Sequence, residues 1–331
     1  MKILITGGSG YIGSLLCPFL LNKSHSLRVL DTCYFGYDFL PHENKNFELI
    51  KGDIRDLSLV EKSLQGIDTV IHLACISNDA SFELDEQLST TINLDAFEPL
   101  VRKSKESGVK RFVYASSSSV YGLSDKKDVK EDHPLIPLTL YNKFKGLCEP
   151  ILFNYTDENF TGVIFRPATV CGFAPRMRFD LSVNILTNHA INNKLIKVFG
   201  GNQMRPNLHI QDYCDVVDLF INIEKEKIQN EIFNVGFQNM TINNLAELVK
   251  KTVERYFEDF NVSIEKTSSN DNRSYHINSD KIYSALGFKP KKSIENAIED
   301  ICNAFQKNMF DDSMNNTSYY NVKKIKELKI K

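Results

Sequence analysis

Two residues that stand four positions apart could together remove a proton from a hydroxyl group. Tyr141 and Lys145 show the spacing Y-x-x-x-K, and residues four apart lie on one face of a helix. A lysine ammonium beside a phenol favours the phenolate and lowers the tyrosine pKa from its usual value of about 10. The pair could therefore act as a base while an alcohol is oxidised. The same spacing is common on solvated helix faces, so the hypothesis needs support from other motifs.

A serine-rich turn upstream supplies further polar groups. Ser116, Ser117, Ser118 and Ser119 follow an apolar run and precede Val120-Tyr121-Gly122. A serine hydroxyl at the end of a strand can hydrogen-bond a reacting oxygen. Such a turn would mean little alone, and it gains meaning only beside the tyrosine and lysine pair.

The glycines near the start of the chain predict a dinucleotide site. Gly7, Gly10 and Gly13 form a G-x-x-G-x-x-G pattern between the first apolar run and the first helical pattern. A tight turn and a closely approaching diphosphate both require residues without a Cβ atom, and the helix N-terminus offers unpaired N–H groups. The strand–turn–helix context makes the pattern specific. Pro18 lies inside the expected helix, where it should remove a hydrogen bond and kink it.

Two aspartates mark the adenosine end of this site. Asp31 ends the predicted second strand, close to the spacing of an acidic residue that hydrogen-bonds the ribose hydroxyls. A carboxylate there repels a 2′-phosphate, which favours NAD over NADP. Asp53, followed by Ile54, ends the predicted third strand, where the adenine edge would lie. A plain turn aspartate is nearly as good an interpretation of Asp53.

The elements that must position these residues alternate in periodicity through the first half. Short β-branched runs predict strands at Ile3–Thr6, Leu27–Leu30, Phe47–Ile50, Thr69–Leu73, Phe112–Ala115 and Val163–Phe165. Helical spacing lies between most of them, at Tyr11–Asn22, Leu57–Leu64, Glu86–Ser107 and Tyr141–Tyr155. Continuous apolar strands separated by helices are typical of a buried parallel sheet. We therefore predict an α/β fold with a Rossmann-type doubly wound parallel sheet.

After about Pro167 the pattern changes, and a smaller mixed α/β C-terminal substrate lobe is expected. Helical patterns recur at Asn243–Phe257 and Ser293–Phe305. We assign residues 1–170 to the NAD-binding domain, with 210–235 returning to it. Residues 171–209 and 236–310 form the predicted substrate lobe, and 311–331 form a polar C-terminal tail. A frayed terminus is the favoured interpretation of that tail, and a partner contact the weaker one.

Composition narrows the function classes. Forty Lys and Arg against 42 Asp and Glu give a net charge of −2, which argues against a nucleic-acid partner. No apolar run is long enough for a bilayer, and the N-terminus does not resemble a signal peptide, so we expect no membrane partner and a cytoplasmic location. The seven cysteines include no C-x-x-C pair and the seven histidines no H-E-x-x-H motif. Buried reduced thiols and no metal are expected.

The order of these motifs over roughly residues 1–305 resembles the extended short-chain dehydrogenase/reductase superfamily, in its NAD-dependent nucleotide-sugar epimerase/dehydratase branch. The family's alanine-rich turn after the fourth strand is similar to His72-Leu73-Ala74-Cys75, with Cys75 where alanine is usual. Its helix asparagine corresponds to Asn93, and its strand end near the nicotinamide to Arg166-Pro167-Ala168-Thr169-Val170. Cys171 replaces a usual tyrosine.

The resemblance implies NAD as the cofactor. Counting back from Val120-Tyr121-Gly122 places the catalytic serine at Ser117, beside Tyr141 and Lys145 as the other catalytic residues. The implied cofactor-binding residues are Gly7, Gly10, Tyr11, Ile12, Gly13, Asp31, Asp53, Ile54, Leu73, Ala74, Cys75, Asn93, Ser116, Tyr141, Lys145 and Pro167.

The implied substrate is a GDP- or UDP-linked nucleotide-diphosphate sugar. Arg205 and Arg273 match two arginines that grip the diphosphate, a group that suits the bidentate bonds of a guanidinium. Ser77, Asn78 and Ser118 complete the implied substrate-binding set. Pro206-Asn207 departs from the family's Asp-Phe and leaves the local geometry open.

The serine turn bears on the reaction. Dehydratases of this branch carry Thr-Asp-Glu where this chain has Ser117-Ser118-Ser119. Elimination of water needs an acid and a base that two serines cannot supply near neutral pH, so dehydration is disfavoured. Oxidation at C4 remains, either as a net dehydrogenase or as the first half of a 4-epimerase. A regulatory or structural family member and a steroid-type reductase are weaker alternatives, because the glycine and tyrosine motifs are intact and paired arginines are present.

Two further expectations concern context and assembly. The segment Ile76–Asp85 resembles a subgroup from bacterial capsule and lipopolysaccharide pathways. The helices at Glu86–Ser107 and Tyr141–Tyr155 carry more apolar residues than one sheet face can cover. Family members pair these helices as a four-helix bundle, and two-fold dimers are the commonest oligomers. We therefore expect a homodimer.

Overall fold

A seven-stranded sheet forms the centre of the computed structural model, which describes residues 1–329 apart from 125, 127, 269–273 and 275. Every neighbouring pair of strands is parallel, in the order β3-β2-β1-β4-β5-β6-β10. The strands are β1 (Lys2–Thr6), β2 (Ser26–Asp31), β3 (Phe47–Lys51), β4 (Thr69–His72), β5 (Arg111–Ala115), β6 (Thr161–Pro167) and β10 (Glu231–Val235). The predicted doubly wound Rossmann-type sheet is thereby confirmed, and its order reverses between β1 and β4, where such sheets bind ligands.

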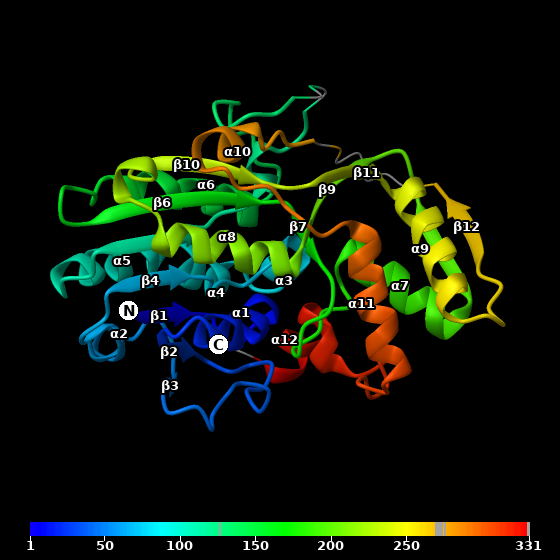
Figure 1. The fold of residues 1–331 in the computed structure, drawn as a ribbon, viewed down its shortest axis with the longest axis horizontal. Coiled ribbons are helices and arrows are strands. Elements are labelled where there is room, and N and C mark those ends of the chain that lie inside the picture. The colour runs from blue at the N-terminus through cyan, green and yellow to red at the C-terminus, as the bar shows by residue number, and fades with distance from the viewer. Residues whose placement is uncertain (125, 127, 269–273, 275, 330–331) are drawn as a thin grey trace.

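Helices cover both faces of the sheet, and each face has its own apolar cluster (Figure 1). One face carries α1 (Tyr11–Asn22) and α8 (Ile210–Asn222). The other carries α2 (Leu57–Leu64), α5 (Phe97–Glu106) and α6 (Leu140–Phe153). The starts of α1 and α2 match the sequence prediction because local signals determine them. The Asp56 side chain caps α2, and α1 follows the glycine turn and continues through Pro18.

The single helix expected over 86–107 is divided. It consists of α4 (Glu86–Thr90), a π-helical turn η1 (Thr91–Asp95) and α5. Pro99 has no N–H and is therefore confined to the first turn of a helix, which favours a new start near Phe97. A π turn widens a helix and redirects its side chains, and such turns are frequent at functional sites.

A smaller lobe stands beside the carboxyl ends of the strands (Figure 1). Its own core lies between α7 (Ser182–Asn193), α9 (Ile242–Tyr256), α11 (Ile294–Gln306) and a two-stranded parallel sheet of β8 (Leu195–Phe199) and β12 (Ser263–Thr267). A three-stranded sheet connects it to the main domain, with β7 (Thr169–Cys171), β9 (Met204–His209) and β11 (Gln238–Thr241). The remaining elements are α3 (Asp79–Phe82), η2 (Ser118–Tyr121), η3 (Lys225–Lys227) and α10 (Asp280–Leu286).

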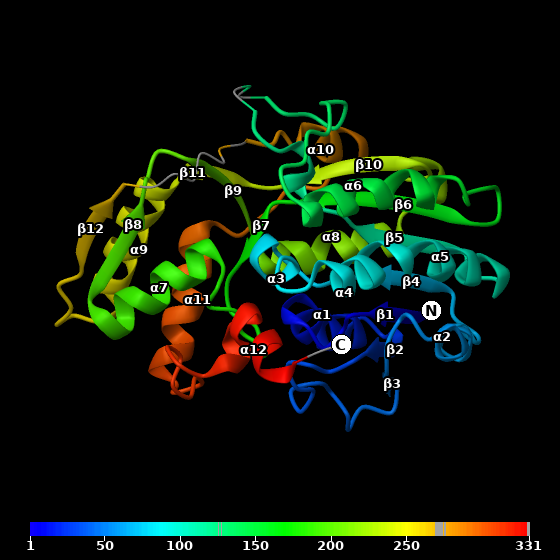
Figure 2. The same cartoon turned by 180° about the vertical axis from the view of Figure 1, so that it is seen from behind.

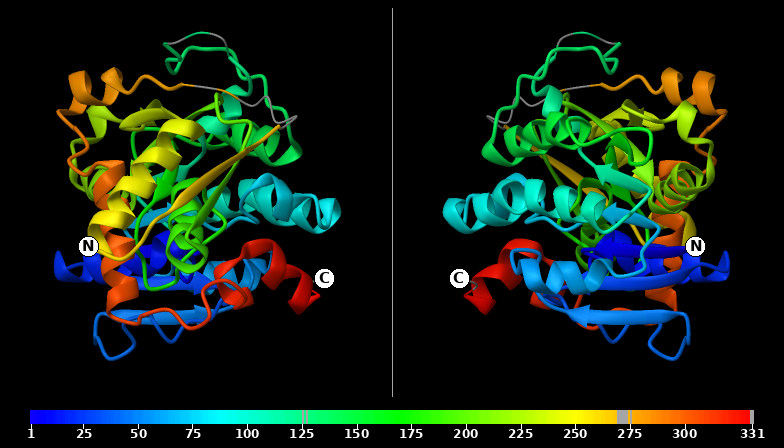
Figure 3. Two further views of the ribbon diagram at one scale, coloured as in Figure 1. Left: turned by 90° about the vertical axis from the view of Figure 1, so that its right-hand side faces the viewer. Right: turned by 90° about the vertical axis from the view of Figure 1, so that its left-hand side faces the viewer.

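The C-terminal segment is folded, so the expectation of a frayed terminus is wrong. It contains η4 (Thr317–Tyr319) and α12 (Asn321–Leu328), which lie between the sheet domain and the smaller lobe (Figures 2 and 3). Tyr320 packs in one apolar cluster with Tyr11 of α1 and Ile301 of α11. Because the segment is mostly polar, its few buried contacts could not be recognised from the sequence.

Two findings complete the description. None of the described helices is long and apolar enough to cross a membrane. All seven cysteines carry free thiols, and six of them are buried.

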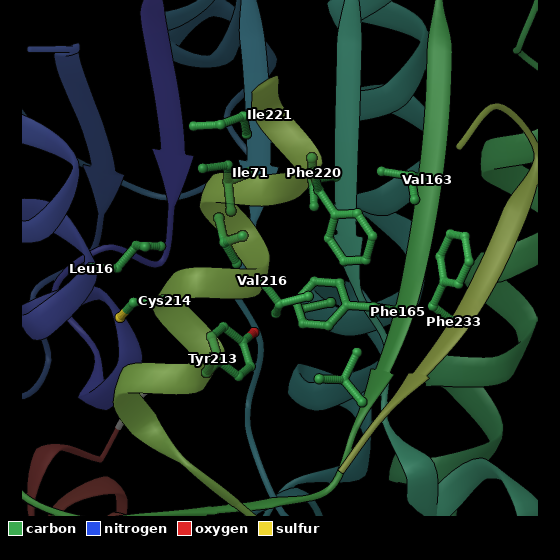
Figure 4. Packing of buried hydrophobic residues seen from close by; sticks show 14 of the residues in the cluster. Leu16, Ile71, Val163, Phe165, Tyr213, Cys214, Val216, Phe220, Ile221 and Phe233 are labelled. Atoms are coloured by element: carbon green, nitrogen blue, oxygen red, sulfur yellow. The ribbon is translucent and has the colours of Figure 1, made fainter. Parts of the chain in front are cut away.

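Helix α8 provides a test of the core. Phe220 is fully buried, with its ring centroid 5.5 Å from that of Phe165 on β6 and 5.7 Å from that of Phe233 on β10 (Figure 4). We predict that Phe220→Ala lowers the free energy of unfolding by about 3–5 kcal/mol, because it leaves a cavity that the sheet cannot close. Phe199→Ala is the matched control, since that ring is 57% exposed. Urea unfolding followed by circular dichroism compares them, and equal losses would contradict this account of the core.

Candidate active site

A cleft of about 440 Å³ runs along the carboxyl ends of the central strands and is bordered by the smaller lobe. It contains most of the site residues predicted from the sequence. Those that line it are Gly7, Gly10, Tyr11, Ile12, Asp31, Asp53, Ile54, Leu73, Ala74, Cys75, Ser77, Asn78, Ser116, Ser117, Ser118, Tyr141, Lys145, Pro167 and Arg205. Gly13 and Asn93 do not line it, and Arg273 lies outside the described residues.

The glycine turn has the geometry of a diphosphate cradle. Gly7 has φ +79°, and a Cβ atom there would lie 2.5 Å from the backbone nitrogen of Ala74. A Cβ at Gly13 would lie 2.2 Å from the carbonyl oxygen of Gly8, so Gly13 permits close packing of turn and helix rather than contact with a ligand. Gly10 at the start of α1 has no side-chain cap. The helix N-terminus is therefore available to an anion, as a dinucleotide requires.

The adenosine end of the cleft is marked by Asp31. Its two carboxylate oxygens accept hydrogen bonds from the backbone N–H groups of Ser9, at 2.9 Å, and Cys33, at 2.7 Å. Burial raises the pKa of Asp31, and these two bonds oppose that shift. Asp53 also lines the cleft, and it forms an ion pair with Arg55 at 2.8 Å.

Asn93 lies behind the wall of the cleft and is hydrogen-bonded to the backbone of that wall. Its side chain accepts a hydrogen bond from the backbone N–H of Ile76, at 2.8 Å, and donates one to the carbonyl of Ile76, at 2.9 Å. The π turn η1 supplies this side chain. Asn93 is therefore a positioning residue for the turn at Ala74 and Cys75, although sequence comparison implied a cofactor contact.

The tyrosine and lysine pair lies on α6, which starts at the Thr139 cap. The Lys145 ammonium is 6% exposed and donates a hydrogen bond of 2.8 Å to the carbonyl oxygen of Ala115 at the end of β5. It also lies 5.2 Å from the centroid of the Tyr114 ring. Tyr141 is one turn earlier on the same face, and both residues line the cleft.

The serine turn faces this pair. The hydroxyl of Ser117 lies 2.7 Å from that of Ser119, which in turn donates to the side-chain oxygen of Asn142 on α6. Ser118 is buried at the start of η2. Ser116 points elsewhere, because its hydroxyl donates a 2.7 Å hydrogen bond to Glu149. Ser116 therefore borders the cleft while its hydroxyl supports the structure behind it.

The predicted substrate-binding residues that the structure describes include Asn78 and Ser77, which follow the fourth strand, and Arg205 of the lobe. Asn78 has φ +72° and caps α3 through a hydrogen bond from the Ser81 N–H, so its amide oxygen has a local role. Ser77 is held by donors from elsewhere, Arg178 at 3.2 Å and Asn321 at 2.8 Å. Arg205 reaches the cleft from β9 of the lobe, and one of its N–H groups donates to the Met204 carbonyl.

The sequence analysis missed several residues of the cleft whose side chains bear on its chemistry or on its walls. They include Asp79, Arg176, Arg178, Asn321 and Ile325. The two arginines stand in Arg176-Met177-Arg178 shortly after Pro167, and their spacing in a loop beside the cofactor strands was a usable signal. Asn321 and Ile325 gave none, because only the fold brings the end of the chain back to the cleft.

Several known proteins are similar to this chain over most of its length. The mouse dTDP-D-glucose 4,6-dehydratase is 29% identical over 93% of this chain and 89% of its own length. The UDP-glucose 4-epimerase of Lactobacillus helveticus is 27% identical over 92% of this chain and 96% of its own. A solved structure of UDP-glucuronic acid 4-epimerase from Bacillus cereus, in complex with UDP-glucuronic acid and NAD, superposes with a TM-score of 0.81. It is 27% identical and covers 93% of this chain and 99% of that one.

The family match spans most of the sheet domain and its return strand. Residues 3–236 match the NAD dependent epimerase/dehydratase family. The glycine cradle, the buried Asp31 and the free helix N-terminus fit the dinucleotide that this family uses. The chain therefore belongs to the NAD dependent epimerase/dehydratase family, and its cofactor is NAD.

Proposed function

We propose that this protein oxidises C4 of a nucleotide-diphosphate sugar. The observation that carries the proposal is the placement of Lys145, whose buried ammonium is fixed beneath the serine turn on the helix that presents Tyr141 to the cleft. When bound, NAD supplies the acceptor for the hydride that leaves the sugar carbon. The net reaction is a dehydrogenation or, as the alternative, the first half of a 4-epimerisation.

The chain's own residues handle the proton. Tyr141 takes it from the C4 hydroxyl, and the Lys145 ammonium stabilises the phenolate form of that tyrosine. Ser117 hydrogen-bonds the reacting oxygen. His72 lies nearby, and burial together with Lys145 lowers the pKa of His72 to about 3, so this histidine is neutral at working pH. The positive charge that stabilises the Tyr141 phenolate is therefore supplied by Lys145 and not by His72.

The substrate's diphosphate is assigned to the lobe side. Arg205 on β9 supplies one guanidinium, and Arg273, outside the described residues, is proposed as the second. The relatives named above act on UDP- and dTDP-linked sugars according to their names. The likeness of Ile76–Asp85 to a bacterial capsule subgroup supports a finer proposal: GDP-D-glycero-manno-heptose, converted to its 4-keto form in the synthesis of surface polysaccharide.

One observation favours a 4,6-dehydratase as a second candidate. Ser118 and Ser119 supply neither acid nor base, but the carboxylate of Asp79 also lines the cleft. It accepts a 2.6 Å hydrogen bond from the hydroxyl of Thr139, the residue that caps α6 two positions before Tyr141. A carboxyl group at this end of the cleft is the type of residue that elimination of water requires.

The product distinguishes these reactions. We expect incubation with NAD and a panel of UDP-, dTDP- and GDP-sugars to give a sugar that has lost two hydrogens, or an epimer of unchanged mass. Mass spectrometry and deuterium incorporation at C4 report both. A product that has lost one water would contradict the proposal and support the dehydratase, and Asp79→Asn would then be expected to abolish that loss.

The catalytic assignment is tested by Tyr141→Phe. We predict a fall in turnover of about 10²–10⁴-fold, because the proton acceptor is lost while the ring stays. Binding of NAD, measured by calorimetry, should change little. Tyr283→Phe is the matched control, since that ring is 58% exposed on α10. A Tyr141 variant with nearly unchanged turnover would remove this residue from the role of base.

Cofactor preference is tested at Asp31. We predict that NAD binds at least about tenfold more tightly than NADP, because the carboxylate repels the 2′-phosphate. Asp31→Asn should reduce this preference, whereas the same change at exposed Asp38 should not. Equilibrium dialysis measures the two dissociation constants, for NAD and for NADP, of each protein. Tighter binding of NADP by the unaltered protein would show that Asp31 does not face the ribose.

We also propose a homodimer through the outer faces of α5 and α6. Leu147 on α6 is 42% exposed, which a partner helix would explain. Light scattering at micromolar concentration should give a dimer mass, and Leu147→Glu should shift it toward the monomer because it places a charge in the interface. Phe199→Glu is the control, because that exposed ring lies on β8 of the smaller lobe. A monomer mass for the unaltered protein would overturn the proposal.

A further inference from the structure

Two buried arginines line the cleft without filling their hydrogen-bonding capacity. Arg176 and Arg178, in the loop between β7 and α7, are 4% and 7% exposed. The Nε atom of Arg176 and the Nη2 atom of Arg178 are buried, and neither has a hydrogen-bond partner among the described residues. A buried N–H without a partner is costly, and more so on a charged group. Such groups in a cleft indicate a ligand that accepts hydrogen bonds.

The charge of Arg176 also indicates a ligand in the cleft. Within the described part of the chain no carboxylate forms an ion pair with this guanidinium, whereas Arg178 pairs with Asp180 at 2.8 Å. Burial, with the nearby charge of Arg178, lowers the pKa of Arg176 to about 9. An anion in the cleft would compensate this buried charge, and a guanidinium suits the paired oxygens of a phosphate.

The position of Arg176 selects the anion. Its backbone N–H donates to the hydroxyl of Ser14 in the first turn of α1, at 3.1 Å. Its guanidinium carbon lies 3.9 Å from the centroid of the Phe35 ring, which follows the second strand and Asp31. This is the adenosine half of the cleft, next to the uncapped N-terminus of α1. The substrate-side Arg205 approaches from β9 of the lobe instead.

The C-terminal helix holds this arrangement. The side-chain oxygen of Asn321 accepts a 2.6 Å hydrogen bond from Nη2 of Arg176, and its amide nitrogen donates to Ser77 at 2.8 Å. The backbone N–H of Asn321 donates to Asp180 at 2.9 Å, so one residue connects both arginines. One turn later on α12, Ile325 also lines the cleft and belongs to the apolar cluster that Phe35 packs against.

We infer that Arg176 binds the diphosphate of the dinucleotide beside the N-terminus of α1, with Arg178 as a second cation nearby, and that Asn321 positions them. The inference rests on the proposed function only in placing NAD in this cleft. Helix α12 is thereby part of the cofactor site, because Asn321 hydrogen-bonds Arg176 and lines the cleft with Ile325. Asn321 acts through the arginines and Ser77, so it is a positioning residue.

Truncated ligands test the assignment without any measurement of turnover. ADP-ribose carries the diphosphate and adenosine does not, so the two separate this contact from the rest of the site. We expect Arg176→Gln to weaken the binding of ADP-ribose by NAD-free protein about 10–100-fold, while adenosine binding stays within about twofold. Calorimetric titration measures both. Lys326→Ala, on the exposed face of α12, is the control and should change neither.

The Asn321→Ala variant keeps both guanidinium groups, and it provides the test if the Arg176→Gln variant does not fold. ADP-ribose should bind about 3–10-fold more weakly, and bound NADH should dissociate faster when followed by its fluorescence. Unchanged ADP-ribose affinity in the folded variants, with weaker binding of UDP, dTDP or GDP, would assign the arginines to the substrate and overturn the inference. A lower unfolding midpoint with no change in any affinity would also overturn it, as a merely structural role.

The outcome for the unaltered protein separates this inference from the proposed function. If it binds ADP-ribose but none of the three nucleoside diphosphates, the proposed substrate class fails. The ADP-ribose titrations of the variants then still test the assignment of the arginines. If it binds no ADP-ribose, the inference itself fails.

Discussion

The hydrogen bond between the Lys145 ammonium and the Ala115 carbonyl fixes the chemistry of the cleft, because it joins α6 to the end of β5. Burying an ammonium costs several kcal/mol unless it is well partnered. Here the carbonyl and the face of the Tyr114 ring compensate it. Once the lysine is held in this way, α6 can lie in only one rotation, and Tyr141 one turn earlier must face the cleft. A charge that is costly to bury therefore determines the position of Tyr141, the proposed base.

A second buried ionic group strengthens the same junction. Glu149, one turn after Lys145 on α6, pairs with Arg166 of β6 at 2.6 Å and accepts the hydroxyl of Ser116. Arg166 in turn donates to the hydroxyl of Tyr121 in η2. Each member is buried and hydrogen-bonded, which is the condition under which buried polar networks specify one arrangement. The network ties α6, β6 and the serine turn together, so the reactive residues are carried by rigid elements although the turn is a loop.

The sequence predicts those parts of the molecule that local signals determine. Alternating periodicity identified the first six strands, and the glycine turn set the start of α1, because a Cβ at Gly7 or Gly13 would collide with neighbouring backbone. The signals fail where distant segments meet. The π turn at Thr91–Asp95 looks like ordinary helix in the sequence, and nothing near Asn321 indicates that it lies against Arg176. Asn93 and Ser116 were found, but the direction of their side chains depends on partners that only the fold supplies.

The smaller lobe and the loop after β7 both bring positive charge to the cleft, from separate parts of the chain. The lobe brings Arg205 to the cleft from β9, while the loop after β7 brings Arg176 to it beside Ser14 of α1. In a low-dielectric cleft these positive charges act more strongly than they would in water, and they attract phosphates at both ends. Under the proposed function, binding energy from phosphate groups far from the reacting carbon holds the sugar and the cofactor in register. The proposed chemistry then needs only the Tyr141 phenol, the Lys145 ammonium and the Ser117 hydroxyl, because phosphate groups that do not react set the alignment of the reacting atoms.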